Sequence, residues 1–171
     1  MTILGIIIII VVAILLIISI IFVRIVKPLT VVIIERSGVY YRTLKSGIRL
    51  LLPNKNDIFK LISLKEKLAN FKYQQVLTKN NEKLQIEMIL FYQISDAGIY
   101  TYGINEPLKG LEKLSFITLK SIVNKLNLDE TIKNCDAINT RMRELLNEAT
   151  NSWGIKINKV NLNNIIIQKE N

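Results

Sequence analysis

Three serines lie near lysines in the sequence, and a serine beside a lysine is one form of hydrolytic nucleophile. They are Ser63, Ser95 and Ser121. A working Ser–Lys pair also needs a desolvated lysine and hydrogen-bond donors for an oxyanion, and no sequence pattern supplies either. The chain contains no histidine, which excludes Ser-His-Asp and Cys-His nucleophiles and imidazole metal sites. A membrane-bound hydrolase is therefore only a third alternative, and no catalytic residue is predicted.

Asp129, Glu130 and Asp136 are close enough in sequence to suggest a pair of catalytic carboxylates. Positions at helix starts explain them without any catalytic role, and Asp129 is expected to be an N-cap. The single cysteine, Cys135, can form neither an internal disulfide nor a tetrahedral thiolate site. Palmitoylation or a lowered thiol pKa are alternatives to the preferred interpretation, a partly buried and unreactive thiol. The glycine spacing fits no phosphate-binding loop, so no metal or cofactor is expected.

The N-terminal part of the chain predicts a membrane anchor. After a two-residue tail (1–2), residues 3–23 are apolar except for Gly5 and Ser19. As a helix this run is about 31 Å long, which matches the roughly 30 Å hydrocarbon core of a bilayer. A cleaved signal peptide is the alternative, but the run has no basic segment before it and no small-residue cleavage site after it. An uncleaved transmembrane helix is therefore predicted.

Positive charge is concentrated in the half of the remaining chain that follows this run. Residues 24–83 carry 13 Lys and Arg against 4 Asp and Glu, whereas residues 84–171 carry 10 of each. Arg24 and Lys27 flank the C-terminal end of the run, so the positive-inside rule places the domain in the cytoplasm. A solvated lysine-rich face is the alternative to lipid contact, and the stretch has no nucleic-acid recognition pattern. The membrane-proximal basic candidates are Arg24, Lys27, Arg36, Arg42, Lys45 and Arg49.

The segment after Pro28 predicts a series of β-strands. Turns at Gly38 and Gly47 separate three short strands, the third closed by Pro53, and their spacing indicates an antiparallel meander. The expected strands are residues 30–36, 39–44, 48–52, 58–64, 71–78 and 84–94. The last of these has the clearest alternation in the chain, so burial should fix its register. Its buried face is predicted to hold Leu84, Ile86, Met88, Leu90, Tyr92 and Ile94.

Helical spacing follows this long strand. Asn105 is the expected N-cap of a helix that runs to about residue 126 with Pro107 in its first turn. A second helix starts at 127–130, and a third has one buried stripe: Ile138, Met142, Leu145, Leu146, Ala149 and Trp153. Gly154 is expected to end that helix, and residues 155–167 form a last strand with a bulge near Asn158. The fold class is therefore α+β, a mainly antiparallel sheet with helices on one face.

Five short motifs in this order resemble the stomatin/prohibitin/flotillin (SPFH, or band 7) family. They cover roughly residues 1–167, with 24–167 as the SPFH domain and 168–171 as a C-terminal tail. The motifs are Glu35 to Leu44 with Ser46-Gly47, Thr78 to Asn81 leading to Phe91 through Asp96, Thr118 to Ile122, Leu128 to Glu130, and Trp153 to Ile155. The sequence departs from the family pattern at Ser46, Asn80, Ala97, Lys120 and Cys135.

The resemblance implies a non-enzymatic membrane scaffold whose copies assemble into rings or cages. Implied partners are membrane lipids, further copies of the chain, and a membrane protease or other integral membrane protein; nucleic acid is not expected. Relatives continue into a long C-terminal helix, and the present sequence has no heptads sustained enough to form one. A monomeric, membrane-tethered module that binds lipid or protein is therefore the alternative. The expected localisation is the cell membrane, with a single span and a cytoplasmic domain.

Overall fold

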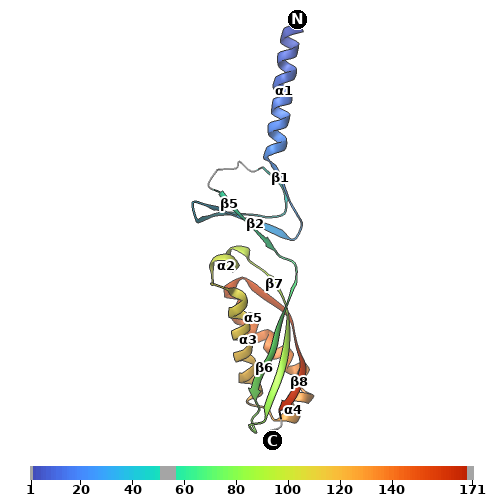
Figure 1. Cartoon of the computed structure of the whole chain (residues 1–171), viewed down its shortest axis with the longest axis vertical. Coiled ribbons are helices and arrows are strands. Elements are labelled where there is room, and N and C mark those ends of the chain that lie inside the picture. The colour runs from blue at the N-terminus through green and yellow to red at the C-terminus, as the bar shows by residue number, and fades with distance from the viewer. Residues whose placement is uncertain (1, 51–56, 169–171) are drawn as a thin grey trace. The chain divides into compact units, whose positions relative to one another are not determined.

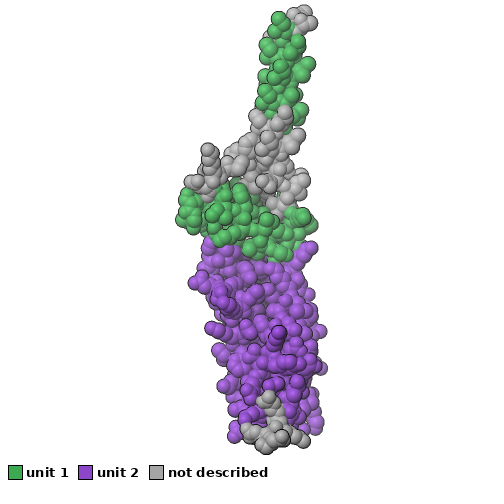
Figure 2. Space-filling model, in the orientation of Figure 1, with its two compact units in different colours: residues 1–63 green, residues 64–171 purple. Residues whose placement is uncertain are grey.

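The structure is a computed structural model that describes residues 2–50 and 57–168. Within these ranges the side chains of residues 2, 4, 15, 17–26, 48–50 and 168 are not described. The chain divides into two compact units, Met1–Ser63 and Leu64–Asn171, which Figure 2 colours separately. The expected strand end at Pro53 lies outside the described residues.

The first unit begins with helix α1 (Thr2–Phe22), within one residue of the expected helix at each end. Strand β1 (Val23–Val26) starts at the next residue, so no loop separates helix from strand (Figure 1). Counting only the residues that the structure describes, no helix combines the length and the apolar character needed to cross a bilayer. The membrane span remains a prediction.

Two antiparallel sheets complete the first unit. One pairs β1 with β4 (Gly47–Leu50), and the other has the order β3-β2-β5. The strands of the second sheet are β2 (Thr30–Arg36), β3 (Val39–Leu44) and β5 (Asp57–Ser63). The predicted meander is wrong in one respect, because β4 pairs with β1 and not with β3. The β-branched residues of β1 favour a strand where the sequence analysis placed only the exit from the helix.

A two-residue turn joins β2 to β3, as predicted. Ser37 (φ 53°) and Gly38 (φ 79°) are both left-handed, the geometry of a type I′ hairpin turn. Further along β3 the register shifts, since Glu35 pairs with Tyr40 but Ile34 pairs with Arg42. Tyr41 is therefore the extra residue of a β-bulge. The buried core of this sheet consists of Val32, Ile34 and Leu44.

The second unit contains a three-stranded antiparallel sheet of order β6-β7-β8. Its strands are β6 (Lys67–Leu77), β7 (Lys83–Ile94) and β8 (Ile155–Gln168). The predicted alternation of β7 is confirmed, because all six residues of its expected inner face are buried. The predicted bulge in β8 is also confirmed: Phe91 pairs with Lys159 but Tyr92 with Ile157, which leaves Asn158 unmatched.

Helices cover the inner face of this sheet (Figure 1). They are α2 (Ala97–Tyr102), α3 (Pro107–Val123), α4 (Leu128–Lys133), α5 (Cys135–Thr150) and the 3-10 turn η1 (Asn151–Trp153). The buried side of α5 (Ile138, Met142, Leu146) packs with α3 residues such as Leu119 against the inner face of β7. The predicted α+β class, with antiparallel strands, is confirmed, although the strands form three sheets.

The helix starts differ from prediction at two positions. Glu106, not Asn105, is the N-cap of α3, and it has a left-handed backbone (φ 52°) before Pro107. Asn127, not Asp129, is the N-cap of α4: its backbone is extended, and its N–H donates to Glu130 Oε2 at 2.9 Å. Asp129 lies inside the first turn of α4, where its negative charge interacts favourably with the positive end of the helix dipole.

Candidate functional site

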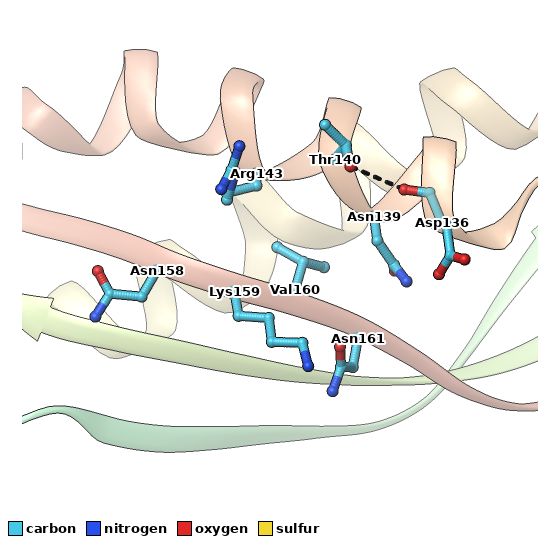
Figure 3. Close-up of a pocket in the computed structure, with 8 residues that line it drawn as sticks. All are labelled: Asp136, Asn139, Thr140, Arg143, Asn158, Lys159, Val160 and Asn161. Carbon is cyan, nitrogen blue, oxygen red and sulfur yellow. Dashed lines mark hydrogen bonds between the residues drawn. The ribbon is translucent and has the colours of Figure 1, made fainter.

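A polar hollow of about 380 Å³ lies between α5 and β8 (Figure 3). It is lined by Asp136, Asn139, Thr140, Arg143, Asn158, Lys159, Val160 and Asn161. Thr140 Oγ1 donates to the backbone oxygen of Asp136 at 3.0 Å, which satisfies the hydroxyl within its own helix. Small-molecule sites are mostly apolar with a few polar groups, whereas one valine is the only apolar lining residue here. Among the described residues no group of three acidic or sulfur ligands could hold a metal ion.

Helix α5 hydrogen-bonds directly to the outer edge of β8. Asn147 Nδ2 donates to the carbonyl of Ile157, and Asn147 Oδ1 accepts from the Ile157 N–H, both at 2.8 Å. Asn139 Oδ1 accepts from the Leu162 N–H at 3.0 Å. One side-chain amide thus pairs with Ile157 as a peptide group of a neighbouring strand would. The helix thereby satisfies backbone groups that an added strand would otherwise bind.

We expect Asn147→Ala to lower the free energy of unfolding by about 2 kcal/mol, because it leaves an N–H and a carbonyl without protein partners. Asn147→Asp should be no better, since a carboxylate oxygen then faces the Ile157 carbonyl. Denaturant unfolding measures both losses. The control Glu148→Ala removes an exposed side chain one residue away and should change stability by less than about 0.5 kcal/mol. Wild-type stability in Asn147→Ala would mean that water replaces both bonds.

The basic candidates of the first unit differ in whether their charge is already paired with another group of the protein. Arg36 donates from Nε and Nη2 to the two carboxylate oxygens of Asp57, at 3.0 and 3.3 Å. Its guanidinium also lies 4.2 Å from the ring centroid of Tyr41. The hydrogen bond to Asp57 is the main cause that raises the pKa of Arg36. Arg36 is therefore an internal ion-pair partner rather than a free membrane-facing cation, a role that the sequence did not indicate.

The remaining basic candidates fall into two groups. Lys27, Arg42 and Lys45 are exposed, and the Arg42 guanidinium lies 5.5 Å from the Tyr41 ring centroid. The side chains of Arg24 and Arg49 lie outside the described residues, although the two positions are cross-strand partners in the β1–β4 ladder.

Strands β3 and β5 also carry exposed apolar side chains, which the sequence analysis missed. On β3 they are Val39, Tyr40 and Tyr41, and on β5 they are Ile58, Phe59 and Leu61. Aromatic and basic residues together are typical of surfaces at the membrane interface. In this sheet only the central strand β2 has a continuous buried run, residues 31–35, whereas most of β3 and β5 is exposed.

The structure shows the surroundings of two serines and of the cysteine that were considered for a chemical role. The Ser121 hydroxyl donates to the Thr118 carbonyl at 2.8 Å, and Ser95 is exposed at the end of β7. Cys135 is half-buried, and burial followed by the nearby Asp136 charge raises the pKa of its thiol. The thiol is therefore largely protonated at neutral pH, as expected for an unreactive cysteine.

Two of the residues given a structural role in the sequence analysis, Trp153 and Gly154, lie after the end of α5 at Thr150, in and directly after the 3-10 turn η1. Trp153 is half-buried and packs against the core of the second unit. Gly154 has a left-handed backbone (φ 68°), and its carbonyl accepts from the Ser95 N–H at 2.9 Å. Gly47 has φ 127° where the chain enters β4.

A family model described as "SPFH domain / Band 7 family" matches residues 24–171. The chain belongs to this family. The match confirms the resemblance inferred from the five motifs. Three of the five motifs each contain a turn residue with a left-handed backbone. These residues are Gly38, Asn81 and Gly154.

Longer relatives carry the same SPFH region. The chain is 31% identical over 142 residues to an uncharacterized protein of Methanothermobacter thermautotrophicus, which covers 83% of this chain and 44% of the relative. It is 32% identical over 133 residues to an uncharacterized protein of Mycobacterium tuberculosis, a match that covers 78% of this chain and 35% of the relative. It is 32% identical over 124 residues to human "Stomatin-like protein 2, mitochondrial", a match that covers 72% of this chain and 35% of the relative. The chain thus spans less than half the length of these curated relatives.

Proposed function

We propose that this SPFH protein is a membrane-associated scaffold that assembles with copies of itself and has no catalytic activity. The observation that carries the proposal is the family match over residues 24–171, which starts directly after the apolar run 3–23. In this proposal α1 is a single membrane anchor. The apolar composition of the run and its length of about 30 Å as a helix support that role.

The surface of the first unit supports contact with an anionic leaflet. The first 63 residues hold eight Lys and Arg and two Asp and Glu. Because Arg36 is paired with Asp57, the described cations open to lipid phosphate are Lys27, Arg42 and Lys45. Each basic residue near such a surface contributes about 1 kcal/mol, and exposed tyrosines favour the headgroup region. The flanking charges Arg24 and Lys27 favour a cytoplasmic domain in the cell membrane.

The proposed scaffold acts through binding partners. Besides lipids and further copies of the chain, a membrane protease or another integral membrane protein is the kind of partner that such a scaffold would regulate. Neither a cofactor nor nucleic acid has a role in this proposal.

Light scattering on the detergent-solubilised full chain tests self-assembly. A scaffold should have a protein mass several times that of the 19.6 kDa protomer, after subtraction of the micelle. A monomer across a wide concentration range would contradict the proposal.

A second candidate function is the monomeric, membrane-tethered binding module. It is favoured by the way α5 satisfies the β8 edge, because that contact removes one surface through which copies could join. The same light-scattering measurement distinguishes the two candidates.

A further inference from the structure

A groove of about 400 Å³ lies between α5 and the C-terminal end of α3. It is lined by six residues, half of them apolar: Ile122, Leu126 and Leu145 with Ser121, Lys125 and Arg141. The apolar three are half-buried, and the other three are exposed. A lining that combines apolar side chains with a few charged groups is typical of binding sites, unlike the polar hollow between α5 and β8.

The apolar surface continues from this groove along α3. Ile117 lies four residues before Ser121, so the two side chains are on the same face of the helix. Ile117 is 63% exposed, the highest value among the large apolar side chains described in the second unit. Residues 117–125 span about 12 Å at 1.5 Å per residue. The groove and Ile117 together therefore match about two turns of another helix.

Two cations give this surface a positive charge. Among the described residues, none pairs its charge with Lys125. Arg141 Nη1 donates to Glu144 Oε2 at 3.2 Å, and these two side chains are 62% and 54% exposed. Exposed ion pairs of this kind contribute little to stability, so the guanidinium can exchange Glu144 for another carboxylate.

We propose that the groove between α3 and α5 binds an acidic amphipathic helix of a partner protein. The proposal rests on the scaffold function and names the surface through which the scaffold holds its partner. A helix that lays its apolar face into a groove is a recurrent mode of peptide recognition. Here its apolar side chains would contact Ile117 and Leu145, and its carboxylates would lie beside Lys125 and Arg141.

The described helices of this chain do not supply such a segment to a second copy. The apolar side of α5 is buried against the sheet, and α3 carries three lysines and one glutamate. Helix α4 has Asp129 and Glu130 in its first turn, but it has only six residues and ends in Lys133. Charge complementarity therefore favours a helix from another protein.

Peptide binding to the full chain in phosphatidylcholine nanodiscs tests the proposal. The probe is a fluorescent peptide of about twelve residues, with leucine at every third or fourth position and glutamate between. A second peptide has lysine in place of each glutamate, and empty nanodiscs give the background. Fluorescence anisotropy should show at least tenfold tighter binding of the glutamate peptide. Equal affinity for the two peptides, or no binding of the first, would overturn the proposal.

Paired variants at exposed positions locate the binding surface. Lys125→Glu should weaken binding of the glutamate peptide at least fivefold, whereas the same charge change on β8, Lys156→Glu, should leave the affinity within twofold. Ile117→Ser should weaken binding at least threefold, and its control Ile132→Ser on α4 should not. Equal losses within either pair would mean that the peptide binds elsewhere, and the groove proposal would be wrong.

Light scattering on the wild type separates this proposal from the scaffold function. A wild type that assembles but does not bind the glutamate peptide would leave the scaffold function standing and overturn the groove proposal. A wild type that binds the peptide as a monomer would support the groove and contradict the assembly.

Discussion

Replacing Gly154 with alanine should lower the melting temperature of the solubilised chain by about 10 °C, the largest effect we expect from any single methyl group. Gly154 has φ 68°, a conformation that costs other residues about 1–2 kcal/mol. A Cβ atom there would also lie 2.4 Å from the backbone oxygen of Asp96 and 2.9 Å from the backbone nitrogen of Tyr100. Neither backbone atom can move without breaking the start of α2, so overpacking adds about 1–3 kcal/mol.

Gly38→Ala is the matched control for this prediction. Gly38 has a similar left-handed backbone (φ 79°), but nothing lies within 4 Å of the position that its Cβ would occupy. The control therefore measures the conformational cost alone, about 1–2 kcal/mol. Equal losses in the two variants would show that the contact between Gly154 and Asp96 relaxes, and that close approach is not what requires glycine.

The second large effect is expected from Arg36→Met. The Asp57 side chain is 2% exposed, and Arg36 neutralises it through two hydrogen bonds. Removing one partner of a fully buried pair costs about 3–5 kcal/mol, because the remaining charge is desolvated. Since the Arg36 side chain is 40% exposed and water can enter in its place, we expect a loss of stability smaller than that of a fully buried pair, measured as a lower melting temperature in thermal unfolding.

Two further variants test the cause of that loss. Arg36→Met/Asp57→Asn should recover at least half of it, because no buried charge then remains. Arg42→Met removes an exposed guanidinium beside the same tyrosine and should change stability by less than about 0.5 kcal/mol. A double variant as unstable as Arg36→Met alone would assign the loss to packing on Tyr41 instead.

Local sequence signals predicted much of the second unit. The alternation in β7 fixed its inner face, because a one-residue shift would expose six apolar side chains. Gly154 and the change of phase at Asn158 predicted the end of the helical stretch and the bulge in β8. In each case the information lies within a few residues of the feature, which is why one sequence was sufficient.

The missed features depend on contacts between distant residues. Asn147 is ten residues from Ile157 and Arg36 is 21 residues from Asp57, and the residue types alone do not show which partner each will meet. The pairing of β1 with β4 was missed for the same reason. The exposure of Tyr41 and Leu61 was missed because short strands with mixed residues do not indicate which face will be covered.

The direct passage from α1 into β1 has a mechanical consequence for an anchored protein. Phe22 ends the helix and Val23 begins the strand, so no hinge residue lies between them. A membrane helix tilts when the bilayer becomes thinner. With α1 in a membrane, such a tilt would act as torque on the β1–β4 ladder rather than being absorbed by a flexible linker. If α1 is the proposed anchor, it is also a lever through which bilayer thickness strains the attached strands.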